Sequence, residues 1–66
     1  MKLTLNGEIH NLPDDLTITG LIAHLGLSNK KIAVERNLEV VPKSTFGEVK
    51  LAEGDKLEII HFIGGG

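Results

Sequence analysis

The start of the chain alternates between apolar and polar side chains in the two-residue period of a β-hairpin. Leu3 and Leu5 form the apolar set of the first strand, and an Asn-Gly pair follows at positions 6–7. Both residues of that pair tolerate positive φ, so they favour a two-residue turn. Such a turn pairs Leu5 with Glu8 and puts Ile9 on the face opposite the leucines.

A short helix is predicted next, after the strand-breaking Pro13. Thr17 has the side chain of a helix N-cap, and Gly26 is typical of the position after a helix, where a left-handed backbone is needed. Between them, apolar residues recur every three or four positions and form one stripe, made of Ile18, Leu21, Ile22 and Leu25. Because a helix of about two turns does not persist alone, we expect it to pack on a sheet.

The second half of the chain predicts further strands separated by turns. These strands are expected over residues 31–35, 40–41 and 57–63. Ile32 and Val34 have the parity of core residues in the first of them. A short irregular piece that holds Phe46 precedes the last strand.

This order of elements predicts an α+β fold. We expect a mixed sheet of four to five strands packed on the one short helix, with the last strand beside the first. Residues 1–63 would make up this domain, and residues 64–66 would form a flexible C-terminal glycine tail.

Composition and charge narrow the classes of function. The chain has 66 residues, with nine acidic against seven basic side chains and a formal net charge of −2, which argues against a nucleic-acid-binding surface. The absence of cysteine excludes disulfides, thiolate zinc sites and a cysteine nucleophile. A domain this small retains little stability for holding strained catalytic groups. A carrier or binding module is therefore favoured over an enzyme.

The sequence also predicts a cytoplasmic protein. No apolar run approaches the length of a membrane span or the form of a signal peptide. We expect no membrane partner and no nucleic-acid partner, and a monomer when the chain is free.

The three glycines at positions 64–66 point to chemistry at the main chain. Glycine has no Cβ, so a glycine tail can enter a narrow channel and bring the Gly66 carboxylate to a reactive centre on another protein. Attack of that carboxylate on the α-phosphate of ATP would give an acyl-adenylate, from which a sulfur donor could displace AMP to leave a thiocarboxylate. The sequence contains no phosphate-binding loop, so an ATP-binding partner must supply the first step.

Two segments are specific enough to carry a family resemblance. They are the run Val-Val-Pro-Lys-Ser at 40–44 and the hydrophobic strand that leads into the glycines at 59–66. With the Asn-Gly turn and the helix that ends at Leu25-Gly26, they make the chain similar to the ThiS family over nearly its whole length. That family comprises the sulfur carriers of thiamine thiazole biosynthesis, which have a ubiquitin-like β-grasp fold.

The resemblance implies that Gly66 is adenylated by a ubiquitin-activating-like adenylyltransferase that uses ATP and Mg. Sulfur from cysteine would then reach Gly66 through a sulfurtransferase or cysteine desulfurase, and the thiocarboxylate would donate it to thiazole synthase. Gly64 and Gly65 would be the residues that precede the reactive glycine. The chain itself would have no catalytic residue, bind no cofactor or metal, and act as a co-substrate.

The chain departs from the family pattern at two positions. The family usually has Asn-Gly in its second hairpin, where this chain has Asn37-Leu38. Leucine resists positive φ, so we expect a different or wider loop there. Phe46 stands where the family often has Trp, and we expect it to be a core anchor.

The last strand is apolar on both faces, which predicts a docking surface beside the tail. Ile60 and Phe62 have outward parity and would be exposed there, with Ala33 flanking them. His61 is expected to contact a partner through its position near the tail. The alternative is that a neighbouring loop covers Ile60 and Phe62.

The remaining charged and titratable residues give weaker signals. The three histidines do not have the spacing of a metal site, so we expect no metal ligands among His10, His24 and His61. Five acidic residues allow two interpretations. They could form an acidic docking surface for a basic partner, or, more simply, lie in solvated turns; these residues are Asp14, Asp15, Glu53, Asp55 and Glu58.

Other functions stay open at this level. The same thiocarboxylate chemistry serves molybdopterin synthesis and tRNA thiolation, where the recipient enzyme decides the product. A ubiquitin-like modifier that forms isopeptide bonds with protein lysines is an alternative of another class, and a non-reactive β-grasp interaction domain is a third.

Overall fold

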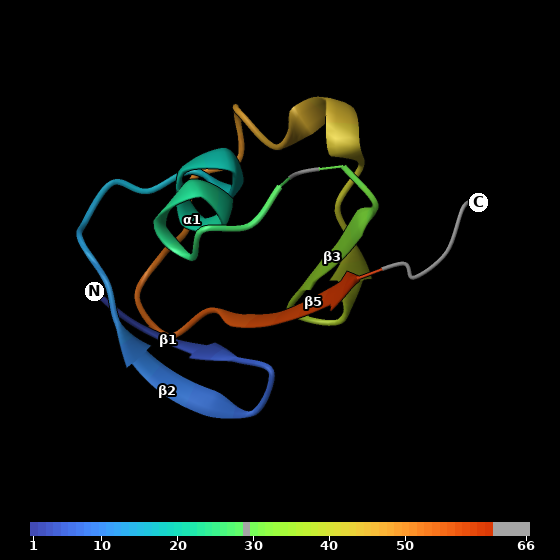
Figure 1. Cartoon of the computed structure of the whole chain (residues 1–66). Coiled ribbons are helices and arrows are strands. Elements are labelled where there is room, and N and C mark those ends of the chain that lie inside the picture. Colours follow the sequence, from blue (N-terminus) through green and yellow to red (C-terminus); the bar gives the residue numbers. More distant parts are fainter. Residues whose placement is uncertain (29, 62–66) are drawn as a thin grey trace.

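The computed structural model describes residues 1–28 and 30–61, and within them one helix packs on one sheet (Figure 1). In chain order the elements are β1 (Lys2–Leu5), β2 (Glu8–Asn11), α1 (Ile18–His24), β3 (Ile32–Arg36), β4 (Glu39–Val40), the 3₁₀ helix η1 (Lys43–Thr45) and β5 (Lys56–His61). The predicted α+β class and the single short helix are confirmed. The division into a domain over 1–63 and a tail over 64–66 stays a prediction, because residues 62–66 lie outside the described residues.

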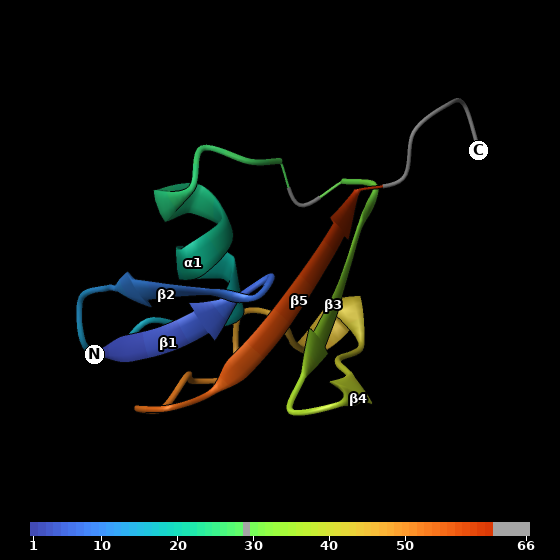
Figure 2. The same ribbon diagram turned by 90° about the horizontal axis from the view of Figure 1, so that it is seen from below.

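The five strands of the described residues form one mixed sheet in the order β2-β1-β5-β3-β4. β1 and β5 are parallel, and the other neighbouring pairs are antiparallel. Figure 2 shows β5 between β1 and β3. The last strand therefore lies beside the first, as predicted, and it occupies the centre of the sheet.

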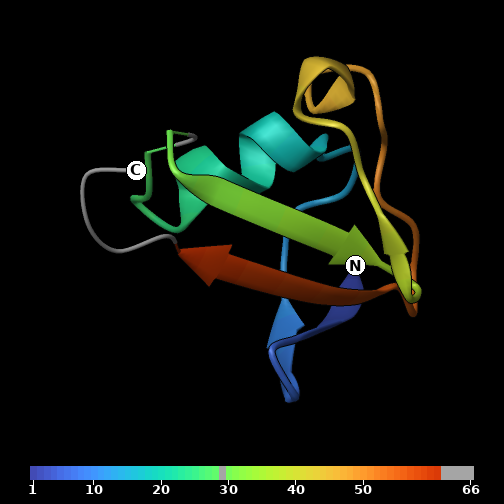
Figure 3. The same ribbon diagram turned by 90° about the vertical axis from the view of Figure 1, so that its right-hand side faces the viewer.

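The core lies between α1 and one face of this sheet. Figure 3 shows α1 and η1 on the same side of β3 and β5. The buried apolar side chains come from every layer and are Leu3, Leu5, Leu12, Ile18, Leu21, Ile22, Ile32, Val34, Phe46, Leu51 and Leu57. The predicted inward parity of the strands and the predicted helical stripe are thus confirmed, with Leu25 partly buried against the same core.

The first hairpin has the predicted register. Leu5 pairs with Glu8 and Leu3 with His10, and both residues of the Asn6-Gly7 turn have positive φ, at 49° and 82°. Ile9 is 69% exposed, on the face opposite the leucines. The local sequence pattern was sufficient to predict the strand pairing of this hairpin, because the turn type fixes the register.

The helix begins and ends where the capping residues predict. The Thr17 hydroxyl oxygen accepts a hydrogen bond from the Gly20 amide at 3.1 Å. Leu25 is the C-cap, and Gly26 follows in the left-handed region at φ 74°. These contacts satisfy main-chain groups that a two-turn helix would otherwise leave unpaired at its ends.

The expectation of a wider loop in the second hairpin was wrong. Arg36 pairs with Glu39, which leaves a tight two-residue turn in which Asn37 and Leu38 have φ of 51° and 73°. The Asn37 side chain accepts a hydrogen bond from the Lys56 amide at 3.0 Å, and the Asn37 amide donates to the Lys56 carbonyl at 2.8 Å. These long-range bonds to β5 hold the turn closed despite the unfavourable φ of leucine.

Candidate functional site

The candidate site is the C-terminal end of β5, where the chain leaves the sheet. β3 follows β5 to His61, the last described residue, through the pairs Val34–Ile59, Ala33–Ile60 and Ile32–His61. Phe62 and the tail glycines Gly64, Gly65 and Gly66, which the sequence predicts to be site residues, lie outside the described residues. What the structure describes is therefore the base from which the tail extends.

Two of the predicted docking residues lie together on the outer face of the sheet, opposite α1. Ile60 is 50% exposed, and its cross-strand partner is Ala33, which is partly buried. No loop of the described residues covers Ile60. We call this pair the outer patch.

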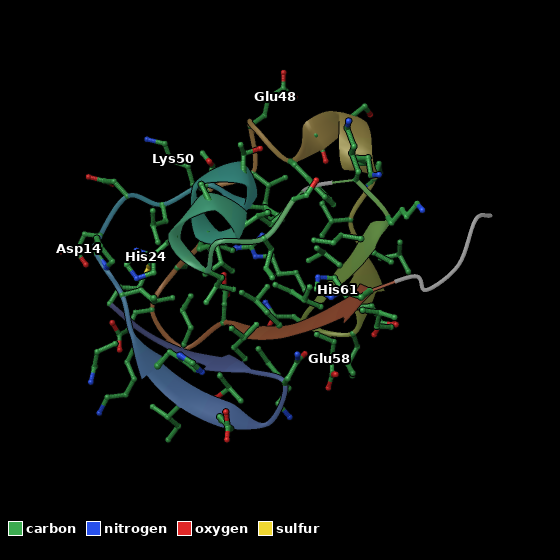
Figure 4. All side chains as sticks on the ribbon, in the orientation of Figure 1. Asp14, His24, Glu48, Lys50, Glu58 and His61 are labelled. Carbon is green, nitrogen blue, oxygen red and sulfur yellow. The ribbon has the colours of Figure 1, made fainter. Side chains whose placement is uncertain are left out.

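His61 lies on the other face of β5. Successive side chains of a strand alternate between faces, so His61 shares the helix side with the buried Leu57 and with Ile59. Figure 4 shows His61 and Glu58 projecting to opposite sides of β5. Nearness in sequence predicted that His61 and Ile60 contact a partner together, but the two lie on different faces of β5, so one flat partner surface cannot contact both.

His61 lines a hollow between the end of α1 and the end of β5. The hollow has a volume of about 310 Å³. Its walls combine apolar and polar groups and are formed by Leu5, Asn6, Leu25, Leu27, Ile59 and His61. The base of the tail thus has two distinct environments, the outer patch on one face and this hollow on the other.

An acidic cross-strand pair adjoins the outer patch, and the sequence analysis missed it. Glu35 and Glu58 are direct partners across β3 and β5, two residues along the strands from Ala33 and Ile60 and therefore on the same face. Like charges directly opposite each other destabilise a sheet. Only the strand register, which is not visible in the sequence, brings these two carboxylates together.

Asp55 does not belong to an acidic docking surface, because it is only 7% exposed. Its carboxylate accepts hydrogen bonds from Arg36 Nε at 2.8 Å, Asn37 Nδ2 at 3.1 Å and the Ala52 amide at 2.8 Å. Burial alone would raise the pKa of Asp55, but these hydrogen bonds and the Arg36 charge hold that pKa below its usual value. Asp55 therefore ties the second hairpin to the segment before β5.

The other histidines lie away from the end of β5. His24 is in the last turn of α1, and Figure 4 shows it well separated from His61. His10 Nε2 is 3.9 Å from a Glu8 oxygen in β2. Within residues 1–28 and 30–61, no group of three His, Asp or Glu side chains is arranged to hold a metal ion. In the same residues, no helix has the length and apolar character to span a bilayer.

Comparison with known proteins places the chain in a family. The family model described as the ThiS family matches residues 3–66. The sulfur carrier protein ThiS of Bacillus subtilis is 45% identical over 65 residues, which cover 97% of this chain and 98% of that protein. The crystal structure of a thiamine biosynthesis protein (ThiS) from Geobacter metallireducens matches with a TM-score of 0.85 at 32% identity, over 100% of both chains.

Longer proteins also match. The thiazole synthases of Paramagnetospirillum magneticum and Magnetococcus marinus are 53% and 52% identical to the whole of this chain. The chain spans only 20% of the length of each. The Bacillus and Geobacter proteins, in contrast, match this chain over essentially their whole length. The chain therefore belongs to the ThiS family and has its ubiquitin-like β-grasp fold.

Proposed function

We propose that the chain is a sulfur carrier of thiamine biosynthesis that carries sulfur as a thiocarboxylate on Gly66. The observation that carries this proposal is the end-to-end likeness to a sulfur carrier protein, at 45% identity over 65 residues. The family match runs through residue 66 and so includes the glycine tail. The position of β5 agrees with this role, because a central strand with neighbours on both sides gives the tail a firm base.

The chemistry takes place at the terminal carbonyl carbon. A carboxylate oxygen of Gly66 attacks the α-phosphate of ATP, pyrophosphate leaves, and an acyl-adenylate forms. A sulfide equivalent then attacks the carbonyl carbon, and AMP leaves with the electrons of the broken C–O bond. The product is a thiocarboxylate whose sulfur is a soft nucleophile.

Partners must supply the catalytic groups for both steps. We assign the first to a ubiquitin-activating-like adenylyltransferase with ATP and Mg, since the sequence has no phosphate-binding loop. The sulfur would come from cysteine through a sulfurtransferase or cysteine desulfurase. In this scheme the chain is a co-substrate and has no catalytic side chain of its own.

The recipient we propose is thiazole synthase. Two relatives named thiazole synthase contain a region 53% and 52% identical to this whole chain. Joining a carrier to its recipient in one chain raises the effective concentration of one for the other, which favours a shared reaction. We assign docking of the partners to the outer patch of Ile60 and Ala33, and the outward parity of Phe62 in the sequence assigns that residue to the same role.

Intact-mass measurement tests the carrier chemistry. The chain is incubated with the adenylyltransferase, Mg-ATP and a sulfur donor, and a parallel reaction omits ATP. We expect a gain equal to the mass difference between one sulfur and one oxygen atom, only when ATP is present. Covalent ladders with other proteins on a gel would show a modifier instead, and no change in mass would show an inert domain.

A second reaction tests the recipient. The thiocarboxylated chain is given separately to thiazole synthase with its other substrates and to the large subunit of molybdopterin synthase with its precursor. We expect the chain to lose its sulfur in the reaction with thiazole synthase and to keep it in the reaction with the molybdopterin synthase subunit. Loss with the pterin enzyme alone would contradict the proposed recipient while leaving the carrier chemistry in place.

A further inference from the structure

The Asn6 side chain makes a pair of hydrogen bonds to the main chain of β5. Its Oδ1 accepts from the Ile59 amide at 2.8 Å, and its Nδ2 donates to the Ile59 carbonyl at 3.3 Å. Asn6 is also the first residue after β1, and its φ of 49° turns the main chain away from the sheet. The side chain therefore reaches β5 at a point where the main chain of β1 no longer can.

These bonds continue the parallel ladder between β1 and β5. The Thr4 amide donates to the Asp55 carbonyl and the Asn6 amide to the Leu57 carbonyl, both at 2.9 Å, so two residues along one strand advance two along the other. The next position on β5 in this series is Ile59. A side-chain amide has one carbonyl and N–H donors, like a peptide group, and here it takes the place of the missing strand.

The site of this contact is the base of the tail. Ile59 precedes Ile60 of the outer patch, and only Ile60 lies between it and His61, the last described residue. In the described residues the strand pairing of β1 with β5 stops at Leu5 and Leu57. Asn6 thus extends the support on the β1 side of β5 by two residues toward the tail.

We propose that Asn6 is a positioning residue for activation of the tail, which holds the end of β5 in place before a partner binds. This inference rests on the proposed sulfur-carrier function. A strand end that is already ordered costs less conformational entropy when it docks, so the contact lowers the concentration of partner needed for binding. Asn6 would act through Ile59, to which its side chain is hydrogen-bonded.

The second hairpin offers a matched control. Asn37 also occupies the first turn position with positive φ, at 51°, and its Oδ1 also accepts from a β5 amide. That amide belongs to Lys56, at the opposite end of β5 from the tail. Substitution of Asn37 therefore removes a bond of the same kind from the same strand, but at the wrong end to affect docking.

The test compares Asn6→Gly with Asn37→Gly. Glycine keeps the positive φ that each turn needs, so only the side-chain bonds are lost. We expect amide hydrogen exchange at Ile59 to be about tenfold faster in Asn6→Gly, and exchange at Lys56 to be faster in Asn37→Gly. We further expect Asn6→Gly to raise the KM of the adenylyltransferase for the chain about fivefold at unchanged kcat, and Asn37→Gly to leave KM unchanged.

A second variant keeps the test decisive if Asn6→Gly does not fold. Asn6→Asp keeps the oxygen that accepts from the Ile59 amide but replaces the donor to the Ile59 carbonyl with a second oxygen, so it should also raise KM. If the parent chain itself takes up no sulfur, both the proposed function and this role are overturned. If the parent is active and Asn6→Gly has the same KM or the same Ile59 exchange, the role of Asn6 alone is overturned.

Discussion

Leu38 has a backbone conformation that leucine rarely adopts. Its φ is 73° and its side chain is 85% exposed at the tip of the second hairpin. A Cβ in the left-handed region costs roughly 1–2 kcal/mol, and the exposed side chain recovers little of this cost by burial. The turn persists because its neighbour Asn37 is bonded to Lys56 and Asp55.

We predict that Leu38→Gly stabilises the protein by about 1 kcal/mol, because glycine removes the steric cost of positive φ. Urea denaturation gives the free energy of unfolding. Leu38→Ala is the control, since it removes the exposed side chain but keeps the Cβ. A glycine variant no more stable than the alanine variant would show that the turn is not strained.

Ile60 is the most exposed residue of the outer patch, so docking there is expected to depend on it most. We predict that Ile60→Ala raises the KM of the adenylyltransferase or thiazole synthase for the chain about tenfold, since a central apolar contact contributes more than 1 kcal/mol to binding. Ile9→Ala is the matched control, because Ile9 is 69% exposed on the same outer face but lies on the far edge strand β2. Equal effects of the two substitutions would place docking elsewhere.

At the scale of elements, sequence pattern predicted the parts that local chemistry determines. The Asn6-Gly7 turn, the Thr17 cap and the Gly26 stop needed only the preferences of neighbouring residues, and each is present as expected. The prediction for the second turn failed because Asn37 is bonded to Lys56 in β5, 19 residues further along the chain, and local residue preferences carry no information about such a contact. The dual role of Asn6 was missed for the same reason.

In the candidate site, too, features that depend on local pattern were predicted and features that depend on long-range contacts were not. Strand parity was enough to predict that Ile60 and Ala33 face outward together, and they are direct partners in the sheet. The same parity separates His61 from them, although nearness in sequence suggested otherwise. The Glu35–Glu58 pair required the register between β3 and β5, which is set by the packing of the whole sheet rather than by either strand alone.

Asp55 links two elements, so its titration should affect their assembly. Because its pKa is lower in the folded state than its usual value, its contribution to stability is complete above the unfolded pKa of about 4 and is lost as pH falls through the lower folded value. We predict that the free energy of unfolding of the parent decreases as pH falls below about 4. Denaturation at a series of pH values measures this slope.

Asp55→Asn should destabilise the protein by about 2 kcal/mol at neutral pH, because its amide N–H₂ would face the donors of Arg36, Asn37 or Ala52. It should also flatten the acid slope, since no charge remains to be neutralised at this position. Asp15→Asn, at an exposed turn residue, is the control and should keep the slope. An Asp55→Asn variant with the slope of the parent would contradict the assignment.

In the molecule as a whole, the folded domain supports the tail, and the proposed reactive group is on the tail itself. The core under α1 and the central position of β5 fix the base of the tail, while the reactive group proposed is the main-chain carboxylate of Gly66. The outer patch and the hollow lined by His61 lie on opposite faces of that base.

Lengthening the chain by one residue tests whether the carboxylate of Gly66 is the group at which sulfur is taken up. One alanine is appended after Gly66, and the initial rate of thiocarboxylate formation is measured by intact mass with adenylyltransferase, Mg-ATP and sulfur donor. We expect rapid conversion of the parent and almost none of the extended chain. Conversion of the extended chain as fast as the parent would contradict this role of Gly66.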